Sequence, residues 1–548
     1  MRVQEVLVLS NNKQMIRQGS LLAVSGILVS IIGFVYRVPM SNMLGEGGAG
    51  IYSVAYNIYN IALTVSSYSF PSGISKVISE QRAKGDTASV KKVFSSTMLL
   101  AALIGAFISL LVYLGRYVLE VIYAKDGLAI TMTVVAPTLF VMALLGVFRG
   151  YYQGIGNMVP TAVSQVIEQI VNAVLSLVLI SYCLNYFQDS DYVSAYGAAG
   201  SLGGTLAGAA AALLFVITAY LPARKRDRPA SKAGIPQVHS STSVTSVWKA
   251  VLLTTLPIAF AQLINQLCGT LDDILFSNIM VYRGLTQDVI SALQGVYSSQ
   301  YSLLIRIPMT IATALSTALL PSIASDYIRR KQADMEEKVN FMLKIVALFT
   351  VPSAVGMSVL AMPILKILFP SLTAYRNYAA VLLYVGTSAI IFYSLSTLTS
   401  TIMQTVRLRR KMLKNSIISL VLHVICVALL LFVTNLGIYA LCIGNILFPL
   451  TICILNIIAL KKETGLKLDL IGLYQKPIIC AAVMGVLAFG VYYLMNYFGI
   501  NLTVTLVASV LLAVISYMCM ILKLRYLKKS ELFDLPFGEA FYNLLKRR

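Results

Sequence analysis

Apolar runs of about 20 residues recur from one end of the chain to the other, and they constrain the fold more than any other feature. A helix of that length crosses the hydrocarbon core of a bilayer. Of the 548 residues, 58% are hydrophobic and only 12% are charged, whereas a soluble domain carries about 25% charged residues. The sequence therefore predicts an all-α polytopic membrane protein.

The same runs predict the number of spans. About fourteen transmembrane helices are expected if each needs about 20 predominantly apolar residues. They begin near residues 16, 51, 93, 126, 160, 194, 246, 288, 339, 376, 411, 438, 477 and 501.

The net charge of +21 is unevenly distributed. Basic residues gather in short clusters between the apolar runs, such as "RKRDRPASK" and "RLRRKMLK", and the chain ends in "LLKRR". Cytoplasmic loops carry an excess of Lys and Arg. The clusters thus predict a multi-pass protein of the cytoplasmic membrane, with both termini in the cytoplasm and no nucleic-acid partner. The predicted outer loops are short and leave no room for a catalytic ectodomain.

No short apolar segment with a small-residue cleavage site precedes the first run, so the first helix is expected to remain as an anchor. The seven cysteines lie mostly within apolar runs and lack metal-binding spacing. They are expected to pack as small apolar residues rather than to form disulfides.

The longest polar stretch, "PARKRDRPASKAGIPQVHSSTS", follows the sixth predicted span. Its Pro, Ser and basic residues predict a flexible cytoplasmic linker. Four parts are expected: an N-terminal lobe over 1–221, the linker over 222–245, a C-terminal lobe over 246–461, and two further spans with a basic tail over 462–548.

The two predicted lobes resemble each other in sequence. "IGFVYRVPMSNML" (Ile32–Leu44) aligns without gaps to "CGTLDDILFSNIM" (Cys268–Met280), and "FPSGIS" (Phe70–Ser75) matches "LPSIAS" (Leu320–Ser325). Six spans is an even number, so both copies would enter the membrane in the same orientation. We expect parallel repeats about an axis along the membrane normal.

This alignment pairs Arg37 in the first span with Asp273 in the seventh. A charged side chain at the centre of a membrane helix costs about 2.5–3.5 kcal/mol on insertion scales, and such residues usually face a cavity or a partner. Arg37 is therefore predicted to line a central cavity. The alternative is that it lies near the outer end of its span and reaches the headgroups. Asp272 and Asp273 are candidate charge partners or coupling groups, or an ordinary interfacial pair.

A second arginine, Arg306, is predicted to be buried in the eighth span, two residues before Pro308. Ser and Thr residues recur around it at intervals of three or four, which places one polar stripe on a helix; they are Ser298, Ser302, Thr310, Thr313 and Thr317. Asn57 and Asn60 follow a similar spacing in the second span. The predicted substrate-binding residues are Arg37, Asn57, Asn60, Ser302, Arg306 and Thr310. For the hydroxyl stripe, close interhelical packing is the alternative.

Two further polar residues lie within predicted spans. Glu168 is either a proton or cation site or a structural partner of Arg149, and His423 is expected to be a hydrogen-bonded core residue. The chain has no phosphate-binding loop motif, so ATP-driven pumping and a bound cofactor are not expected. The glycines of "GAAGSLGGTLAGAAAA" (Gly197–Ala212) predict a small-residue packing face.

Several segments carry a family resemblance: "GFVYRVPMSNMLGEGGAGIYSVAYNIYN", "FPSGISKVISEQRAKGD", "RGYYQGIGNMVPTAVSQVIEQIVN" and "LSTALLPSIA". Across its length the chain resembles the polysaccharide-transporter branch of the multidrug/oligosaccharidyl-lipid/polysaccharide (MOP) exporter superfamily. Within that branch it is similar to the stage V sporulation protein B-like group and the MurJ-type lipid II flippases.

The resemblance implies two six-helix lobes plus two C-terminal helices that form a lateral groove for a lipid tail. It implies a flippase for undecaprenyl-diphosphate-linked sugars, acting as a monomer without a cofactor and driven by the membrane potential or an ion gradient. Arg37 lies at or next to the family's cavity arginine of the first span, and Arg306 lies about a helical turn from that of the eighth.

Two other functions are open from the sequence. A multidrug or cation antiporter of the same superfamily would use carboxylates, which Asp272, Asp273 and Glu168 supply, but Arg37 and Arg306 would oppose a cation. A membrane enzyme acting on lipid-linked sugars would need an outer loop with catalytic acids or histidines, and the sequence predicts only short outer loops.

Overall fold

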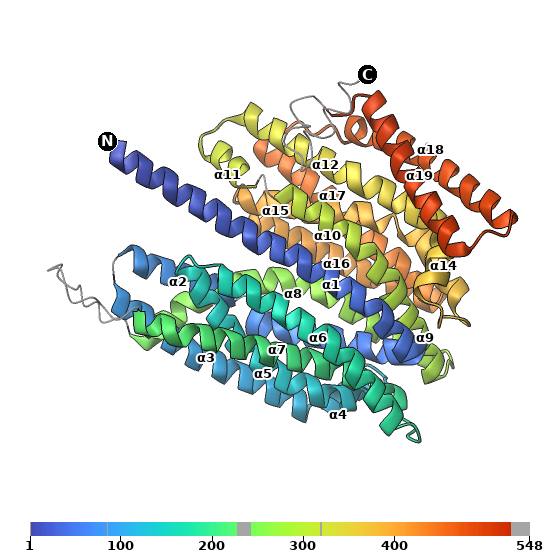
Figure 1. Cartoon of the computed structure of the whole chain (residues 1–548), viewed down its shortest axis with the longest axis horizontal. Coiled ribbons are helices and arrows are strands. Elements are labelled where there is room, and N and C mark those ends of the chain that lie inside the picture. The colour runs from blue at the N-terminus through green and yellow to red at the C-terminus, as the bar shows by residue number, and fades with distance from the viewer. Residues whose placement is uncertain (1, 69, 85, 227–242, 318–319, 528–548) are drawn as a thin grey trace. The chain divides into compact units, whose positions relative to one another are not determined.

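A computed structural model describes residues 2–68, 70–84, 86–226, 243–317 and 320–527 (Figure 1). Within these ranges the regular elements are all helices, with no strand. The predicted all-α fold class is confirmed. In hydrocarbon, every backbone N–H and C=O must be satisfied within the protein, and a helix does this along its own length.

The helices pack as two compact units, Met1–Ser299 and Gln300–Arg548. The first unit contains α1 (Arg2–Leu63), the π-helix η1 (Thr64–Tyr68), α2 (Phe70–Ala83), α3 (Thr87–Leu114), α4 (Arg116–Ile122), α5 (Leu128–Gly154), α6 (Val159–Tyr186), α7 (Val193–Arg226), α8 (Val244–Tyr282) and α9 (Gln287–Gly295).

The helix α1 is folded back on itself at Gly45. A straight helix of its 62 residues would be about 93 Å long at 1.5 Å per residue, about three times the bilayer core. Gly45 has φ 66° and ψ −175°, a non-helical conformation that a residue with a Cβ rarely adopts. The Arg37 guanidinium carbon lies 4.9 Å from the Tyr56 ring centroid, whereas a straight helix would separate these residues by about 28 Å.

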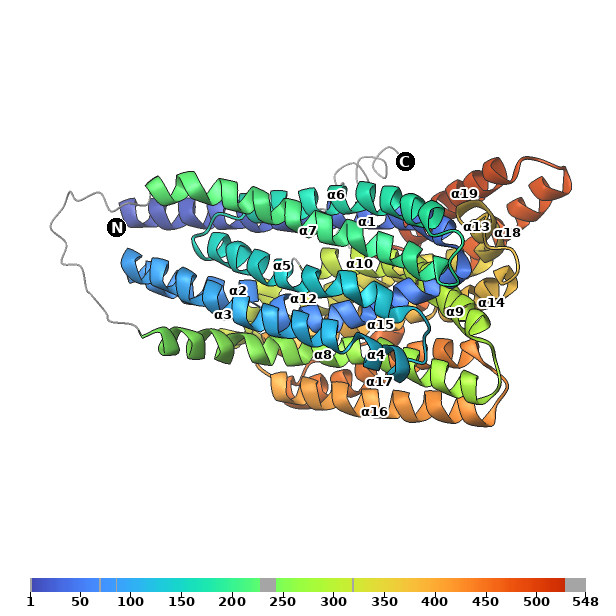
Figure 2. The same ribbon diagram turned by 90° about the horizontal axis from the view of Figure 1, so that it is seen from below.

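Close contact between α6 and α7 depends on glycines of the predicted small-residue face. A Cβ at Gly204 would lie 2.2 Å from the Ser176 hydroxyl oxygen, and one at Gly208 would lie 2.5 Å from the Glu168 carbonyl oxygen. Larger side chains would push the helices apart. Figures 1 and 2 show the two helices side by side along their lengths. The predicted packing face is confirmed.

The π-helix η2 (Val296–Ser302) connects the two units, and the boundary between them lies within it, after Ser299. It contains α10 (Leu303–Thr317), α11 (Leu320–Ile328), α12 (Gln332–Val359), α13 (Ala361–Leu368), α14 (Arg376–Gly386), α15 (Ala389–Thr405), α16 (Arg409–Val433), α17 (Ile438–Thr464), α18 (Leu470–Tyr497) and α19 (Leu502–Lys523). Figure 2 shows α16 beside α17.

Ten helices of the described residues are long and apolar enough to cross a membrane, or eleven if α14 and α15, bent by 50°, form one span. The chain is therefore an integral membrane protein, but the number fourteen is not confirmed. One reason is that the stretch Val24–Ala83 counts once although Gly45 interrupts it. Another is that α8 contributes only a shorter apolar segment, Val244–Leu256.

The predicted lobe boundaries stay a prediction. Most of the expected linker, residues 227–242, and most of the expected basic tail, residues 528–548, lie outside the described residues. The helices α8 and α9, expected in the C-terminal lobe, belong to the compact unit Met1–Ser299. The seven cysteines form no disulfide bond with one another, and four of them are buried.

Candidate functional site

Arg37 is the cation around which the candidate site of the first unit is built. Its side chain is half-buried, and its Nε is buried without a hydrogen-bond partner in the part of the chain that the structure describes. Among the described residues no carboxylate forms an ion pair with it. Its guanidinium lies over the ring of Tyr56, 4.9 Å from the centroid. A desolvated cation–π contact of this kind contributes up to about 2 kcal/mol, but it leaves the N–H groups of Arg37 able to bind an anion.

A stripe of tyrosines extends this site along the second limb of α1. The Tyr52 and Tyr56 rings stack at 5.6 Å between centroids, and Tyr59 follows Tyr56 at 5.9 Å. Sequence reasoning did not select these tyrosines, although their spacing of four and three residues places them on one face. The fold-back at Gly45 brings that face to Arg37.

Two predicted site residues from distant parts of the sequence are in contact. The Asn57 amide Nδ2 donates to Asp273 Oδ2 over 2.7 Å. Asp273 is 7% exposed and its neighbour Asp272 is 4% exposed. Burying a carboxylate is costly unless hydrogen bonds satisfy it, so the amide stabilises the charged form. Asn60 is half-buried, and its backbone carbonyl accepts from Thr64 Oγ1 at 2.8 Å.

A buried lysine belongs to the same part of the first unit. Lys125, between α4 and α5, is 1% exposed and donates to Ser291 Oγ over 3.0 Å. Burial lowers the pKa of Lys125 to about 8, against the opposing attraction of Asp273 and Asp126. Gln294 donates to the Asp273 carbonyl at 3.3 Å and to Ser277 Oγ at 3.1 Å. The sequence did not indicate Lys125, because a loop lysine ordinarily reaches solvent, and it did not indicate Gln294 either.

Glu168 is paired with Arg149. The Arg149 Nη2 lies 2.6 Å from Glu168 Oε2, and its Nε donates to Ser164 Oγ at 3.0 Å. From the sequence, Glu168 could be either a proton or cation site or a structural partner of Arg149. The structure shows the contact that the second role requires. The pair joins α5 to α6 with its charges mutually neutralised.

Arg306 is exposed rather than enclosed by protein, and its predicted place in a substrate cavity stays a prediction. The π-helix η2 precedes α10 directly, and its wider turns rotate the faces of the following helix relative to an α-helical projection. Thr310 is exposed and Ser302 is half-buried. Thr310 Oγ1 donates to the Arg306 carbonyl at 2.9 Å, so this hydroxyl is engaged within its own helix.

An open apolar groove of about 750 Å³ lies within the second unit, between α10, α12, α13, α18 and α19. Its wall is almost wholly hydrocarbon and includes Leu304, Pro352, Gly356, Met484, Val514 and Tyr517. Such a groove can accept an alkyl or prenyl chain but offers little to a charged group.

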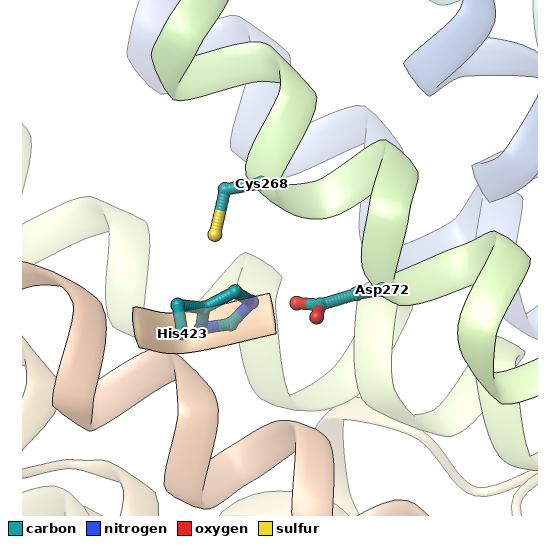
Figure 3. A group of neighbouring side chains, drawn as sticks. All are labelled: Cys268, Asp272 and His423. Carbon is teal, nitrogen blue, oxygen red and sulfur yellow. The ribbon is translucent and has the colours of Figure 1, made fainter. Parts of the chain in front are cut away.

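His423 is the remaining polar residue that the sequence singled out, and it lies within α16. Figure 3 shows Cys268 and Asp272 on successive turns of α8, and His423 on α16. His423 is fully buried, and its Nδ1 lies 3.0 Å from the Gly444 carbonyl oxygen. This is the hydrogen-bonded core environment that the sequence predicted for it.

The family described as "Polysaccharide biosynthesis protein" matches residues 15–327, more than half of the chain. The chain belongs to this family. The matched range covers all of the compact first unit that the structure describes beyond residue 15 and reaches α11 of the second.

Two curated relatives of this polysaccharide biosynthesis family member come from Bacillus subtilis (strain 168). "Stage V sporulation protein B" is 23% identical over 529 residues, covering 96% of this chain and 98% of the relative. "Lipid II flippase MurJ" is 23% identical over 421 residues, covering 74% of this chain and 75% of the relative.

Solved structures show the same fold. The lipid II flippase MurJ in an inward closed conformation aligns with a TM-score of 0.68 at 16% identity, covering 92% of this chain and 98% of that one. An inward-facing multidrug resistance MATE transporter of the MOP superfamily aligns with a TM-score of 0.62 at 15% identity, covering 81% and 98%. The predicted MurJ- and MATE-like fold of this family member is confirmed, and the two proteins with solved structures named here are a flippase and a transporter.

Proposed function

We propose that this protein is a flippase that moves an undecaprenyl-diphosphate-linked cell-wall precursor, lipid II or a similar lipid-linked glycan, across the cytoplasmic membrane. The observation that carries the proposal is the half-buried guanidinium of Arg37, which has an aromatic neighbour but no carboxylate partner among the described residues. A diphosphate supplies the missing anion. Arginine forks match phosphate oxygens in geometry and charge.

The apolar groove of the second unit supports the second half of the proposal. A polyprenyl substrate needs a hydrocarbon surface for its tail while its headgroup is in a polar site. The groove of about 750 Å³ includes the C-terminal helices α18 and α19 in its wall. Its open side would let the rest of the chain remain in lipid.

The energy source is part of the proposal. The sequence contains no phosphate-binding loop, so we propose alternating access driven by the membrane potential or an ion gradient, without ATP or a cofactor. Moving one net charge across 100 mV is worth about 2.3 kcal/mol. We further propose a functional monomer with both termini in the cytoplasm.

A cation-coupled multidrug antiporter is the second candidate, because the MATE transporters share the fold and the first unit buries Asp272 and Asp273. The observation against it is Arg37, a half-buried cation that would repel an organic cation at the same site. Transport tests therefore include both kinds of substrate.

The test uses the purified full-length protein in proteoliposomes with fluorescent lipid II. Protein-dependent appearance of lipid II in the opposite leaflet supports the proposal, and the Arg37→Ala variant should reduce it about ten- to a hundredfold. In the native host, depletion should lower outer-leaflet lipid II detected by an external probe. Normal levels after depletion, with related flippases removed, would contradict lipid II as substrate. Efflux of a cationic dye without lipid movement would favour the antiporter.

A further inference from the structure

Prolines lie inside four helices of the second unit, α10, α12, α17 and α18, and in two of these helices the effect on the backbone is compensated by a tyrosine. Pro352 lies within α12 and Pro477 within α18. Proline has no N–H, so the carbonyl four residues earlier loses its helical donor. The carbonyls released in this way are those of Leu348 and Leu473. A buried carbonyl without a donor is unfavourable, especially where no water reaches it.

Both carbonyls receive a hydrogen bond from a tyrosine of the C-terminal segment. Tyr517 of α19 donates its hydroxyl to the Leu348 carbonyl at 3.1 Å. Tyr526 donates to the Leu473 carbonyl at 2.8 Å. The tyrosines are 4% and 6% exposed, so each hydroxyl is buried with its acceptor.

The chain positions Tyr526 by a local change of direction. The helix α19 ends at Lys523, and Arg525 adopts φ 45°, in the left-handed region. This turn directs the Tyr526 side chain inward, where its hydroxyl also lies 3.4 Å from the Lys344 carbonyl of α12. The two contacts therefore attach the C-terminal segment to α12 at Leu348 and to α18 at Leu473.

The first of these contacts lies in the wall of the apolar groove. Leu348, Pro352 and Tyr517 all line it. Without the Tyr517 hydroxyl, the Leu348 carbonyl would stand unpaired in a hydrocarbon wall, with its full desolvation penalty. The hydrogen bond thus removes a polar defect and holds α19 at a set distance from α12.

We infer that Tyr517 and Tyr526 are positioning residues, which dock α19 onto carbonyls released by Pro352 and Pro477 and thereby set the width of the groove for a long apolar chain. The inference that the groove holds a long apolar chain rests on the proposed function, whereas the inference that the tyrosines dock α19 rests on the hydrogen bonds alone.

The docking is tested by a double-mutant cycle on the full-length protein in detergent. Tyr517→Phe removes only the hydroxyl and should lower the Tm by about 2–4 °C. Pro352→Ala restores a backbone N–H for the Leu348 carbonyl, so Pro352→Ala/Tyr517→Phe should recover most of this loss. Tyr493→Phe, at a side chain that is 62% exposed on α18, is the matched control and should leave the Tm unchanged. A Tyr517→Phe protein with the wild-type Tm, or no recovery in the double variant, would overturn the inference.

The positioning role is tested by lipid affinity. Tyr517→Phe should weaken undecaprenyl phosphate binding about five- to tenfold, the equivalent of about one hydrogen bond. It should leave geranyl phosphate binding unchanged, because a ten-carbon chain does not depend on the groove along its length. Equal affinity of wild type and variant for undecaprenyl phosphate would overturn the positioning role. If the wild type binds neither lipid while the Tm cycle shows coupling, the docking is supported and the proposed function fails.

Discussion

The Asn57 amide donates to the Asp273 carboxylate over 2.7 Å and joins α1 to α8 within the compact first unit. The two residues are far apart in the sequence, and Asn57 lies on the limb of α1 that follows the break at Gly45. The residue before Asn57 is Tyr56, whose ring lies under Arg37. One turn of α1 therefore contacts the candidate cationic group and a buried carboxylate.

Replacing Asn57 by Leu should destabilise the protein by about 1–3 kcal/mol, because a buried acceptor loses its donor. Asp273→Leu in the same protein should recover part of the loss by removing the stranded carboxylate. Thermal unfolding of the single and double variants measures this coupling. Strictly additive effects would show that the 2.7 Å contact contributes nothing.

Arg37→Ala should reduce lipid transport about ten- to a hundredfold, because it removes charge-assisted hydrogen bonds to the headgroup. Arg37→Lys should recover only part of the activity, since an ammonium lacks the planar fork. Arg116 offers a matched control: this first residue of α4 also lies over tyrosine rings, at 4.3 and 4.5 Å from their centroids. Arg116→Ala should transport normally, and equal losses in both variants would count against a specific role for Arg37.

Breaking the Arg149–Glu168 pair should lower the stability of the protein and should not change the dependence of transport on an ion gradient. Removing one member leaves a partly buried charge, so Glu168→Gln should destabilise the protein by about 1–3 kcal/mol. This is less than for a fully buried pair, because the two side chains are 11% and 22% exposed. Arg149→Met/Glu168→Leu should restore much of the stability. A Glu168→Gln protein with wild-type stability but no dependence of transport on an ion gradient would instead identify Glu168 as the coupling site.

Lys125 predicts a rise of stability with pH. Its pKa falls from the ordinary value of 10.5 to about 8 on folding. Between these pH values the unfolded chain binds more protons than the folded one, so the free energy of unfolding rises as pH increases from about 8 to 10.5. The full effect is of the order of 3 kcal/mol. Lys125→Met should remove this pH dependence, and an unchanged profile in that variant would assign it to another group.

Filling the apolar groove should block a long-chain substrate. A Cβ at Gly356 would lie 3.7 Å from the nearest atom, Met484 Cε, so Gly356→Leu projects into the groove without a backbone clash. Gly490→Leu on α18 is the control, because a Cβ there meets nothing within 4 Å and the residue does not line the groove. We expect Gly356→Leu to reduce transport of lipid II and to spare a short-chain analogue. Equal transport of lipid II by both variants would show that the groove does not hold the tail.

Much of the fold could be predicted because its information is local. Each apolar run is a helix since hydrocarbon leaves the backbone no other way to satisfy its hydrogen bonds. The sequence also predicted the small-residue face of Gly197–Ala212 and the core environment of His423, because each depends on the composition of a single helix. The π-helix that precedes α10 could not be predicted, because the spacing of apolar residues does not reveal it, and the exposure of Arg306 could not be predicted either.

By itself, the sequence determined that this is an all-helical membrane protein with charged residues at Arg37, Asp272, Asp273 and Glu168 inside apolar runs. Only the tertiary structure decided their partners: Tyr56 for Arg37, Asn57 for Asp273 and Arg149 for Glu168. The physical reason is the difference in range. Helix formation depends on neighbours a few residues apart, whereas satisfying a buried charge depends on which helix faces it, and the break at Gly45 and the close packing of glycines determine that.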